Sequence, residues 1–348
     1  MDKTANSQIK SSIIKKSLGF PLGTTEAHCF TLSNSKGCEL SVLNYGATIT
    51  SLKIPTASGE KIDVVLGFDA VEDYIKSYHL PSPPYFGAVV GRFAGRINKG
   101  MFTLHGEEIS LTKNWNGHQL HGGLEGFSRK FWKVVDITTD RNPSITLAYL
   151  SAHNEEHFPG ELAVKVKYTL MENNELKVVF EASATQDTPI NLTQHSYFNL
   201  NGHTEQITNQ KLCINSKKII ETTESMIPTG NFINLDQHAF DFSEAKDCPT
   251  SIDTTFVLEG PQAAVLYGET TKLKMTVTTN QPGVHVYVGG NCFESVMGKK
   301  QVSYHSLSGI CFETQNFPDA PNHRNFPNSI VKKGTTYIHE TNFLFENY

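Results

Sequence analysis

The stretch LAVKVKYTL at residues 162–170 decides the fold class, because its apolar and polar residues alternate with a period of two. Successive side chains of a strand point to opposite faces, so one face of this segment is apolar and the other is polar. The apolar face consists of Leu162, Val164, Val166, Tyr168 and Leu170. This pattern is typical of a half-buried antiparallel strand.

Similar alternation recurs along the chain and predicts further strands. It is found at 40–54, 104–111, 144–150, 176–183, 273–279, 284–288 and 335–345. Turn signals separate these segments, for example Asn173-Asn174 and Gln281-Pro282-Gly283. Helical pattern is scarce, and we expect one short helix over 70–76, capped by Asp69. The sequence therefore predicts an all-β protein, a large antiparallel β-sandwich in a single domain over 1–348, with residues 1–20 as a loosely ordered extension.

Composition limits the classes of partner. The 348 residues carry a net charge of -5 without long runs of one sign, which argues against binding to nucleic acid or to an anionic membrane. No stretch approaches the roughly 18 apolar residues that span a bilayer. The six cysteines are at least nine positions apart, so reduced thiols in a cytoplasmic protein are the simplest interpretation. We expect a small neutral molecule as the partner.

Two polar strand positions are candidates for chemistry. In the run at 192–200, His195 shares a face with Thr193, Tyr197 and Asn199. A lone strand histidine is more often structural than catalytic, but a core has no use for a whole polar face unless each group finds a partner. Glu313 ends a short apolar run and precedes a loop broken by proline. A solvated edge glutamate is the ordinary alternative there.

Four runs of residues, in this order, resemble the aldose 1-epimerase family, also called the galactose mutarotase family. They are GRFAGRINKG at 91–100, HGGLEGF at 121–127, NLTQHSYFNL at 191–200 and ICFETQNFPDAPNH at 310–323. SVLNYGATITSLKIP at 41–55 and VVLGFDAVEDY at 64–74 also look like the start of that family, so the resemblance covers nearly the whole chain. It implies a broad β-sandwich with its site on a curved sheet face.

The activity that the resemblance implies is that of an isomerase that interconverts the α and β anomers of hexoses such as galactose and glucose. His195 would be the general acid and Glu313 the general base. No cofactor and no metal are expected, and the partner would be a small aldose. A monomer or a weak homodimer is expected.

The resemblance also implies substrate-binding residues. His121, beside Gly122 and Gly123, would bind the sugar near the reacting carbon, and the two glycines would permit positive φ angles and close approach of a ligand. Of the two arginines in GRFAGRINKG, the family spacing matches Arg96, and Arg92 is then structural or an ion-pair partner.

Asp253, in SIDTTFVL, resembles the family's hydroxyl-binding aspartate. Tyr197, on the face of His195, and His285, in GVHVYVGGN, complete the expected binding set.

The chain departs from the family at three positions. Gly95 stands where asparagine is usual, Thr254 where histidine is frequent, and His285 where glutamine is common. Hydroxyl-reading groups determine which epimer is held, so these departures bear on sugar preference rather than on the acid and the base.

A metal site is the competing interpretation of the segment HNEEH at 153–157, which fits the zinc motif H-x-x-E-H. That motif needs both histidines on one helical face, but Phe158-Pro159-Gly160 follows at once and a strand comes next. His118 and His121 are likewise three positions apart, but no cluster of carboxylates or cysteines accompanies them to complete a metal shell. We therefore expect no metal at either place.

Two other functions stay open. Asp253 and Glu313 could be the paired carboxylates of a glycoside hydrolase. A sugar-binding or sugar-sensing protein of the same fold, without turnover, is the other alternative, although simple binding needs neither Glu313 nor His195.

Overall fold

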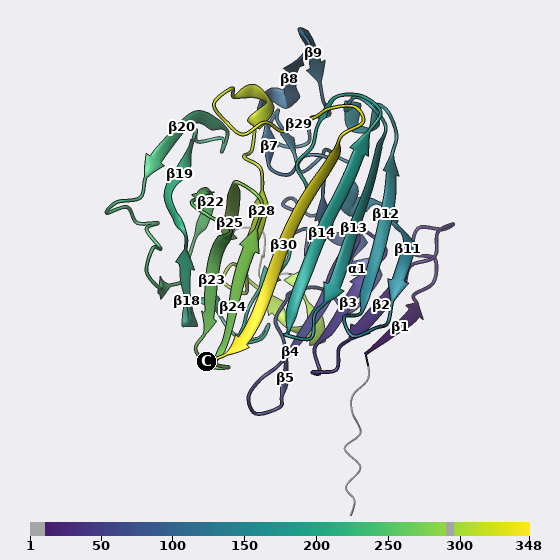
Figure 1. Cartoon of the computed structure of the whole chain (residues 1–348), viewed down its shortest axis with the longest axis vertical. Helices are drawn as coiled ribbons and strands as arrows, with labels where there is room; N and C mark the ends of the chain where they lie inside the picture. Colours follow the sequence, from purple (N-terminus) through teal and green to yellow (C-terminus); the bar gives the residue numbers. More distant parts are fainter. Residues whose placement is uncertain (1–10, 290–295) are drawn as a thin grey trace, which may run out of the picture.

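The computed structural model describes residues 11–289 and 296–348. Its largest element is a nine-stranded antiparallel sheet, seen along its length in Figure 1. In spatial order its strands are β11 (Lys133–Thr138), β12 (Ser144–Ser151), β13 (Leu162–Leu170), β14 (Glu175–Ala184), β30 (Thr336–Asn347), β24 (Leu273–Thr279), β23 (Gln262–Gly268), β18 (Gln210–Ile214) and β21 (Lys246–Asp247).

The alternation that predicts β13 is confirmed. The five residues of its predicted apolar face are buried, whereas Lys165 and Lys167 on the other face are exposed. β13 is paired along its whole length with β12 and β14, so its register is fixed from both sides. A register shift of one residue would expose the entire apolar face, which is why such a strand is strongly specified.

A second, six-stranded antiparallel sheet carries most of the residues with candidate chemistry. Its order is β17 (Tyr197–Phe198), β28 (Ile310–Gln315), β25 (Gly283–Val288), β22 (Ile252–Leu258), β19 (Ser216–Thr222) and β20 (Pro228–Asn234). One face of β28 packs on the nine-stranded sheet, where Thr314 Oγ1 lies 2.6 Å from Thr341 Oγ1 and 3.1 Å from His339 Nε2. The other face of β28 is therefore available for a site. The predicted antiparallel β-sandwich is confirmed.

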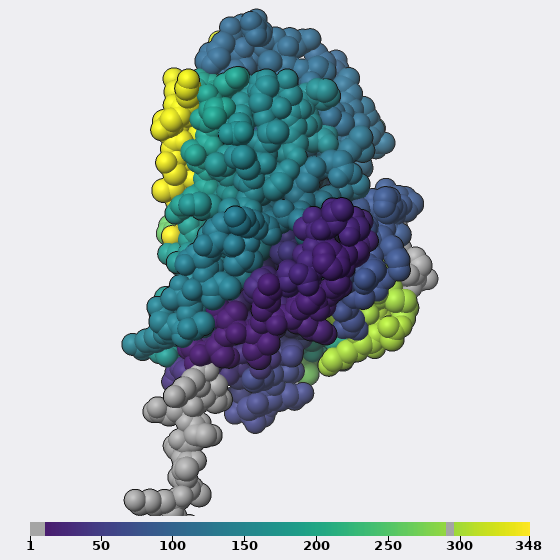
Figure 2. Space-filling model, turned by 90° about the vertical axis from the view of Figure 1, so that its right-hand side faces the viewer, coloured from purple at the N-terminus to yellow at the C-terminus, as the bar shows by residue number. Residues whose placement is uncertain are grey.

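The N-terminal part forms a five-stranded sheet that lies beside the nine-stranded sheet in Figure 2. Its strands, in order, are β1 (Ser12–Ser17), β2 (His28–Ser33), β3 (Glu39–Leu43), β4 (Thr48–Pro55) and β5 (Lys61–Asp63). Within 1–20, where a loosely ordered extension is expected, β1 is a regular strand whose six residues all pair with β2. Residues 1–10 lie outside the described part of the chain.

Among the residues that the structure describes, five short strand pairs complete the sheets. They are β6 (Val89–Val90) with β16 (Thr193–Gln194), β7 (Arg96–Ile97) with β10 (Gln119–Leu120), β8 (Met101–Leu104) with β9 (Glu107–Ser110), β15 (Thr188–Pro189) with β29 (Ile330–Val331), and β26 (Val296–Met297) with β27 (Ser303–Tyr304).

The helices are short, as the sequence predicts. In the described residues there is one α-helix, α1 (Val71–Ser77), and six 3-10 turns. The turns are η1 (Asn98–Gly100), η2 (Phe127–Arg129), η3 (Glu155–His157), η4 (Ile207–Asn209), η5 (Lys299–Gln301) and η6 (Ala320–Asn322).

The expected cap of α1 is wrong. Ala70 is the N-cap residue, and Asp69 instead accepts a hydrogen bond from the Lys300 amide at 2.7 Å. No helix in the described ranges is long and apolar enough to cross a bilayer.

Candidate active site

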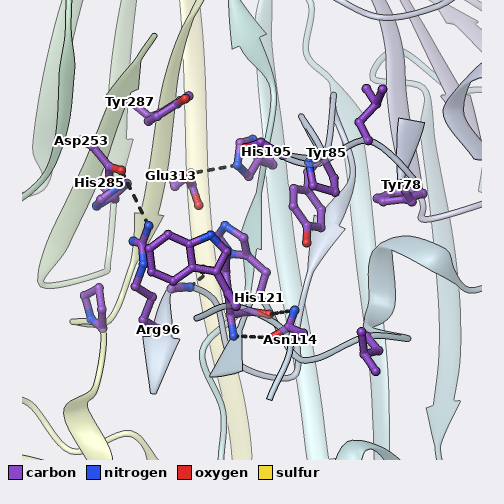
Figure 3. A pocket seen from close by; sticks show the side chains of 18 of the residues that line it. Tyr78, Tyr85, Arg96, Asn114, His121, His195, Asp253, His285, Tyr287 and Glu313 are labelled. Carbon is purple, nitrogen blue, oxygen red and sulfur yellow. Dashed lines mark hydrogen bonds and ion pairs between the residues drawn. The ribbon is translucent and has the colours of Figure 1, made fainter. Parts of the chain in front are cut away.

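A cavity of about 350 Å³ opens on the face of the six-stranded sheet that is turned away from the nine-stranded sheet. Glu313 and Gln315 of β28 line it together with His285 of β25 and Asp253 of β22. The opposite wall comes from loops that carry Tyr85, Trp115 and His121. Figure 3 shows His195 and Glu313 facing each other, with Asp253, His285 and Arg96 on one side and Tyr85 on the other.

The expected acid and base lie close together. His195 Nε2 is 3.5 Å from Glu313 Oε1, and the two residues are only 3% and 2% exposed. The other carboxylate oxygen of Glu313 has no hydrogen-bond partner among the described residues. A potential proton donor and a potential proton acceptor, both almost fully buried, therefore share one wall of the cavity.

His195 is held by its neighbours on every side. The rings of Tyr85 and Tyr197 stack on its two faces at 5.8 and 5.3 Å between centroids. Its backbone N–H donates to Ala88 O at 2.9 Å, and its Nδ1 lies 3.7 Å from Cys311 Sγ. The sequence predicted one strand through this run, but β16 ends at residue 194 and β17 begins at 197. His195 lies in the break between them.

Asp253 and His285 form a charged pair beside Glu313. His285 Nε2 donates to Asp253 Oδ1 at 2.8 Å, and its Nδ1 lies 2.8 Å from Thr255 Oγ1. Burial would lower the pKa of His285, but the hydrogen bond and charge of Asp253 outweigh it and raise the pKa above its ordinary value. Burial would raise the pKa of Asp253, but His285 and the nearby Arg96 lower it.

Arg96 lies between Asp253 and an indole ring. Its guanidinium carbon is 4.5 Å from the centroid of Trp115, which is a cation–π contact, and Nη2 is 3.8 Å from Asp253 Oδ2. Its Nε is buried and has no hydrogen-bond partner in the described ranges. Arg96 therefore keeps donors that a ligand in the cavity can use.

Arg92, in contrast, is a structural residue, as expected. It is 2% exposed, and its guanidinium donates to Ser151 Oγ and to the carbonyls of Ser151, Ala152, Pro159 and Gly160 at 2.7–3.1 Å.

His121 is fixed as a neutral hydrogen-bond donor. The Gly95 N–H donates to its Nδ1 at 3.3 Å, so the proton of the neutral ring lies on Nε2. Burial, followed by the charges of His195 and Arg96, holds the pKa of His121 well below its ordinary value. His121 can thus donate to a ligand oxygen without carrying charge itself.

The glycines after His121 act differently from the expectation. Gly122 and Gly123 do have positive φ angles, of 88° and 105°. A side chain on Gly122 would collide with the carbonyl of Gly91, and one on Gly123 would collide with the carboxylate of Glu156. Because the two glycines have no side chains, the Gly91 carbonyl and the Glu156 carboxylate can lie against them. This space is therefore filled by the protein itself and not by a ligand.

The HNEEH segment has a structural role, because its Glu156 contacts the loop that follows His121. Glu156 accepts hydrogen bonds from the amides of Leu124 and Glu125 at 3.2 and 2.8 Å, which holds the loop that follows His121. His153 Nδ1 accepts from the Gly160 amide at 2.9 Å. The segment forms the 3-10 turn η3 and not the helix that a zinc motif requires.

A possible metal-binding arrangement does arise elsewhere. One ligand atom each of His121, His195 and Glu313 lie within 4.8 Å of one another, a grouping that the sequence spacing could not indicate. Two histidines and a glutamate are a ligand set that zinc accepts. However, the Gly95 amide occupies Nδ1 of His121 and leaves Nε2 protonated, so this imidazole lacks a lone pair for a metal. His118 lies apart from this group, and its Nδ1 accepts from the Lys99 amide.

Comparison with known proteins identifies the family. The sequence model of the aldose 1-epimerase family matches residues 28–344. The chain belongs to the aldose 1-epimerase family. It is 36% identical to galactose mutarotase from Bos taurus, over 93% of this chain and 96% of that protein. It is 29% identical to aldose 1-epimerase from Escherichia coli, over 90% of this chain and 94% of that protein.

Solved structures agree with the family fold. The structure of galactose 1-epimerase from Lactobacillus acidophilus has a TM-score of 0.82 and 25% identity, and it covers 97% of this chain and 99% of its own. An aldose epimerase homologue from C. elegans has a TM-score of 0.84 with the same coverage and 24% identity, which supports the fold alone. The family and the fold that the sequence runs indicate are therefore confirmed.

The structure brings the expected site residues to one cavity, except for Tyr197, which does not line it, and adds others. His121, His195, Asp253, His285, Arg96 and Glu313 all line it. Tyr197 contributes by stacking on His195. Of the departures, Gly95 and His285 line the cavity, whereas Thr254 does not. Gly290 and Asn291 of the GVHVYVGGN run lie outside the described residues.

Sequence reasoning missed Tyr85, Trp115 and Gln315 of the cavity wall. Gln315 had a usable signal, because it is two residues after Glu313 on the same strand face. Trp115 precedes Asn116-Gly117, a frequent hairpin-turn pair, but nothing in that pattern says what the turn faces. Tyr85 stands in a proline-rich loop without periodicity.

Proposed function

We propose that this protein catalyses the interconversion of the α and β anomers of hexoses such as galactose and glucose by acid–base ring opening and reclosure. The observation that carries the proposal is the buried pair of Glu313 and His195, 3.5 Å apart at the wall of a cavity in a chain of this family. Family membership alone gives the reaction class, and this pair gives the groups that would perform it.

Glu313 is the proposed base and His195 the proposed acid. Glu313 takes the proton of the C1 hydroxyl while His195, starting protonated, donates to the ring oxygen as the C1–O5 bond breaks. A half-turn about C1–C2 then presents the other face of the aldehyde, and the two groups exchange roles on reclosure. Each positioned group typically contributes about 10²- to 10⁴-fold to the rate.

Both reacting oxygens, that of the C1 hydroxyl and the ring oxygen, are bonded to C1. Two groups 3.5 Å apart can each reach one of these oxygens from the same end of the sugar.

The remaining groups are proposed to bind the sugar. The neutral Nε2–H of His121 and the free donors of Arg96 can stabilise negative charge on the oxygens of the open-chain form. The ionised Asp253 and its partner His285 can accept and donate hydrogen bonds to hydroxyls away from C1. Tyr197 does not line the cavity and is proposed to position His195 by stacking on it.

Hydrolysis by Asp253 and Glu313 is a weaker alternative. A glycosidase needs one carboxyl group that holds a proton at the pH of the reaction. Asp253 has a lowered pKa and is already bonded to His285, so it is poorly suited to be that acid.

We also propose that the protein acts in the cytoplasm on a free aldose, as a monomer or a weak homodimer. The five cysteines of the described residues are free thiols, which is the state that a reducing compartment maintains. Gel filtration over a range of protein concentrations tests the oligomeric state.

Polarimetry tests the proposed reaction. Freshly dissolved α-galactose and α-glucose should approach their equilibrium rotation faster with the protein than without it, in proportion to its concentration. No acceleration with any aldose would overturn the proposal, and release of a new reducing end from a glycoside would favour the hydrolase.

A further inference from the structure

Gln315 lies on the cavity face of β28, two residues beyond Glu313. Side chains two apart on a strand point to the same side, and Gln315 lines the same cavity as Glu313. Thr314, between them, points to the opposite side and bonds to β30. The strand therefore presents Gln315 to the same ligand that Glu313 meets.

The amide of Gln315 is buried without a protein partner. The residue is 0% exposed, and neither Nε2 nor Oε1 has a hydrogen-bond partner in the described part of the chain. Leaving a buried amide unpaired is costly, and such groups are rare in folded proteins. Gly283 is the residue directly opposite it on β25 and has no side chain to supply the missing bonds.

A second buried glutamine shows the ordinary situation. Gln210 is also 0% exposed, but its Oε1 accepts from the Leu200 amide at 3.0 Å and its Nε2 donates to Asn199 Oδ1 at 2.7 Å. Gln210 does not line the cavity. The protein thus supplies hydrogen-bond partners to the amide of Gln210 but not to that of Gln315, which can bond to a ligand in the cavity.

We propose that Gln315 is a specificity-determining residue that binds sugar hydroxyls away from the reacting carbon. The amide offers one acceptor and two donor hydrogens, which matches neighbouring hydroxyl groups that each donate and accept. Residues two apart on a strand are separated by about 7 Å, roughly the width of a pyranose ring. With C1 at Glu313, the amide of Gln315 reaches the hydroxyl-bearing carbons farther round the ring.

This inference rests on the proposed sugar-handling function and adds a requirement to it. A site that hydrogen-bonds a substrate hydroxyl discriminates strongly against the analogue that lacks it, because the buried polar group is then left unpaired. The described residues give the Gln315 amide no partner, so a sugar with the correct hydroxyl can complete its hydrogen bonds and a deoxy sugar cannot.

The test compares Gln315→Met with the matched control Gln210→Met, using thermal unfolding and polarimetric kinetics with galactose. Gln315→Met should keep or raise Tm, because it removes an unpaired amide, and should raise KM about tenfold with a smaller change in kcat. Gln210→Met should lower Tm and leave KM unchanged, because its bonds serve the fold alone. A lowered Tm with unchanged KM in Gln315→Met would make Gln315 structural and overturn the inference.

Kinetics with deoxy sugars separate sugar binding by Gln315 from a purely structural role, because a structural role would not change the preference for galactose over its deoxy analogues. The wild type should discriminate against one of the 2-, 3-, 4- and 6-deoxygalactoses, and Gln315→Met should handle that analogue with the same kcat/KM as the wild type does. Equal use of galactose and all four analogues by the wild type would overturn the inference even if the variant failed to fold.

Calorimetric titration with galactose separates this inference from the proposed function. If the wild type binds galactose but does not accelerate mutarotation, the proposed function fails, and about tenfold weaker binding by Gln315→Met still supports the inference. Wild-type turnover with unaltered galactose affinity in Gln315→Met overturns the inference alone. A wild type that binds no aldose overturns both.

Discussion

Replacing Glu313 by Gln should nearly abolish mutarotation and leave sugar affinity within a few-fold. The amide keeps the size and shape of the carboxylate and can still accept a hydrogen bond from His195, but it cannot take a proton from the C1 hydroxyl. The rate should fall by about 10²- to 10⁴-fold, or ~3 to 5 kcal/mol of barrier.

The structure favours the upper part of that range. Glu313 is 2% exposed, so water has little access to act in its place. The neighbouring carboxylate, Asp253, is engaged by His285 at 2.8 Å and has a lowered pKa, which makes it a poor substitute base.

The assay is polarimetry on freshly dissolved α-galactose, with the spontaneous rate subtracted, together with calorimetric titration for affinity. Glu224→Gln is the matched control, because Glu224 is exposed in a turn and should keep the full rate. Near-normal turnover of Glu313→Gln, with galactose binding retained, would remove Glu313 from the role of base.

Three further predictions concern the metal, sugar preference and pH. Full activity should survive exhaustive dialysis against EDTA, because the Gly95 amide leaves His121 without a lone pair for a metal, and activity lost on dialysis and restored by zinc would contradict this. The double variant Gly95→Asn with His285→Gln should change the glucose-to-galactose ratio of kcat/KM by about tenfold, or ~1.4 kcal/mol, because amides that read hydroxyls replace groups that read them differently. An unchanged ratio would mean that these departures are structural drift. Finally, the pKa of His285 is raised above 6.5 in the folded protein, so its charged form stabilises the fold. The difference in Tm between the wild type and His285→Gln should therefore be fully present below pH 6.5. It should decline as the pH rises through the folded-state pKa of His285. An advantage that is constant with pH would show that the ion pair with Asp253 does not contribute.

Much of the fold could be predicted from local sequence alone. The period of two in β13 predicts both its extended conformation and its buried face, because burying Leu162 to Leu170 requires that register. The same rule applies to β14, β24 and β30. The cap of α1 was missed because tertiary contact decided it: Asp69 is engaged by the Lys300 amide from a distant loop.

The site was predictable only where the sequence resembles a known family. Alternation alone puts Glu313 on a strand face but cannot tell which face is solvated and which lines a cavity. His195 lies in a break between two short strands, and its orientation depends on Tyr85 and Tyr197 from separate segments. The protonation state of His121 depends on the Gly95 amide, 26 residues away in the sequence. Contacts of this kind are set by the closure of the sheets and have no local pattern.

The different positions of Glu313, Thr314 and Gln315 on β28 follow from the packing of the two sheets. Thr314 is used to join the two sheets, so the alternation of the strand leaves Glu313 and Gln315 on the free face. Rigid strands hold catalytic groups more accurately than loops do, and β28 is paired with β25 opposite both residues. The proposed base and the proposed sugar-binding amide are therefore carried by one rigid strand and cannot move independently. A substitution at Gln315 should consequently alter which sugars are used without displacing the base, because the backbone pairing that positions Glu313 does not involve the Gln315 side chain.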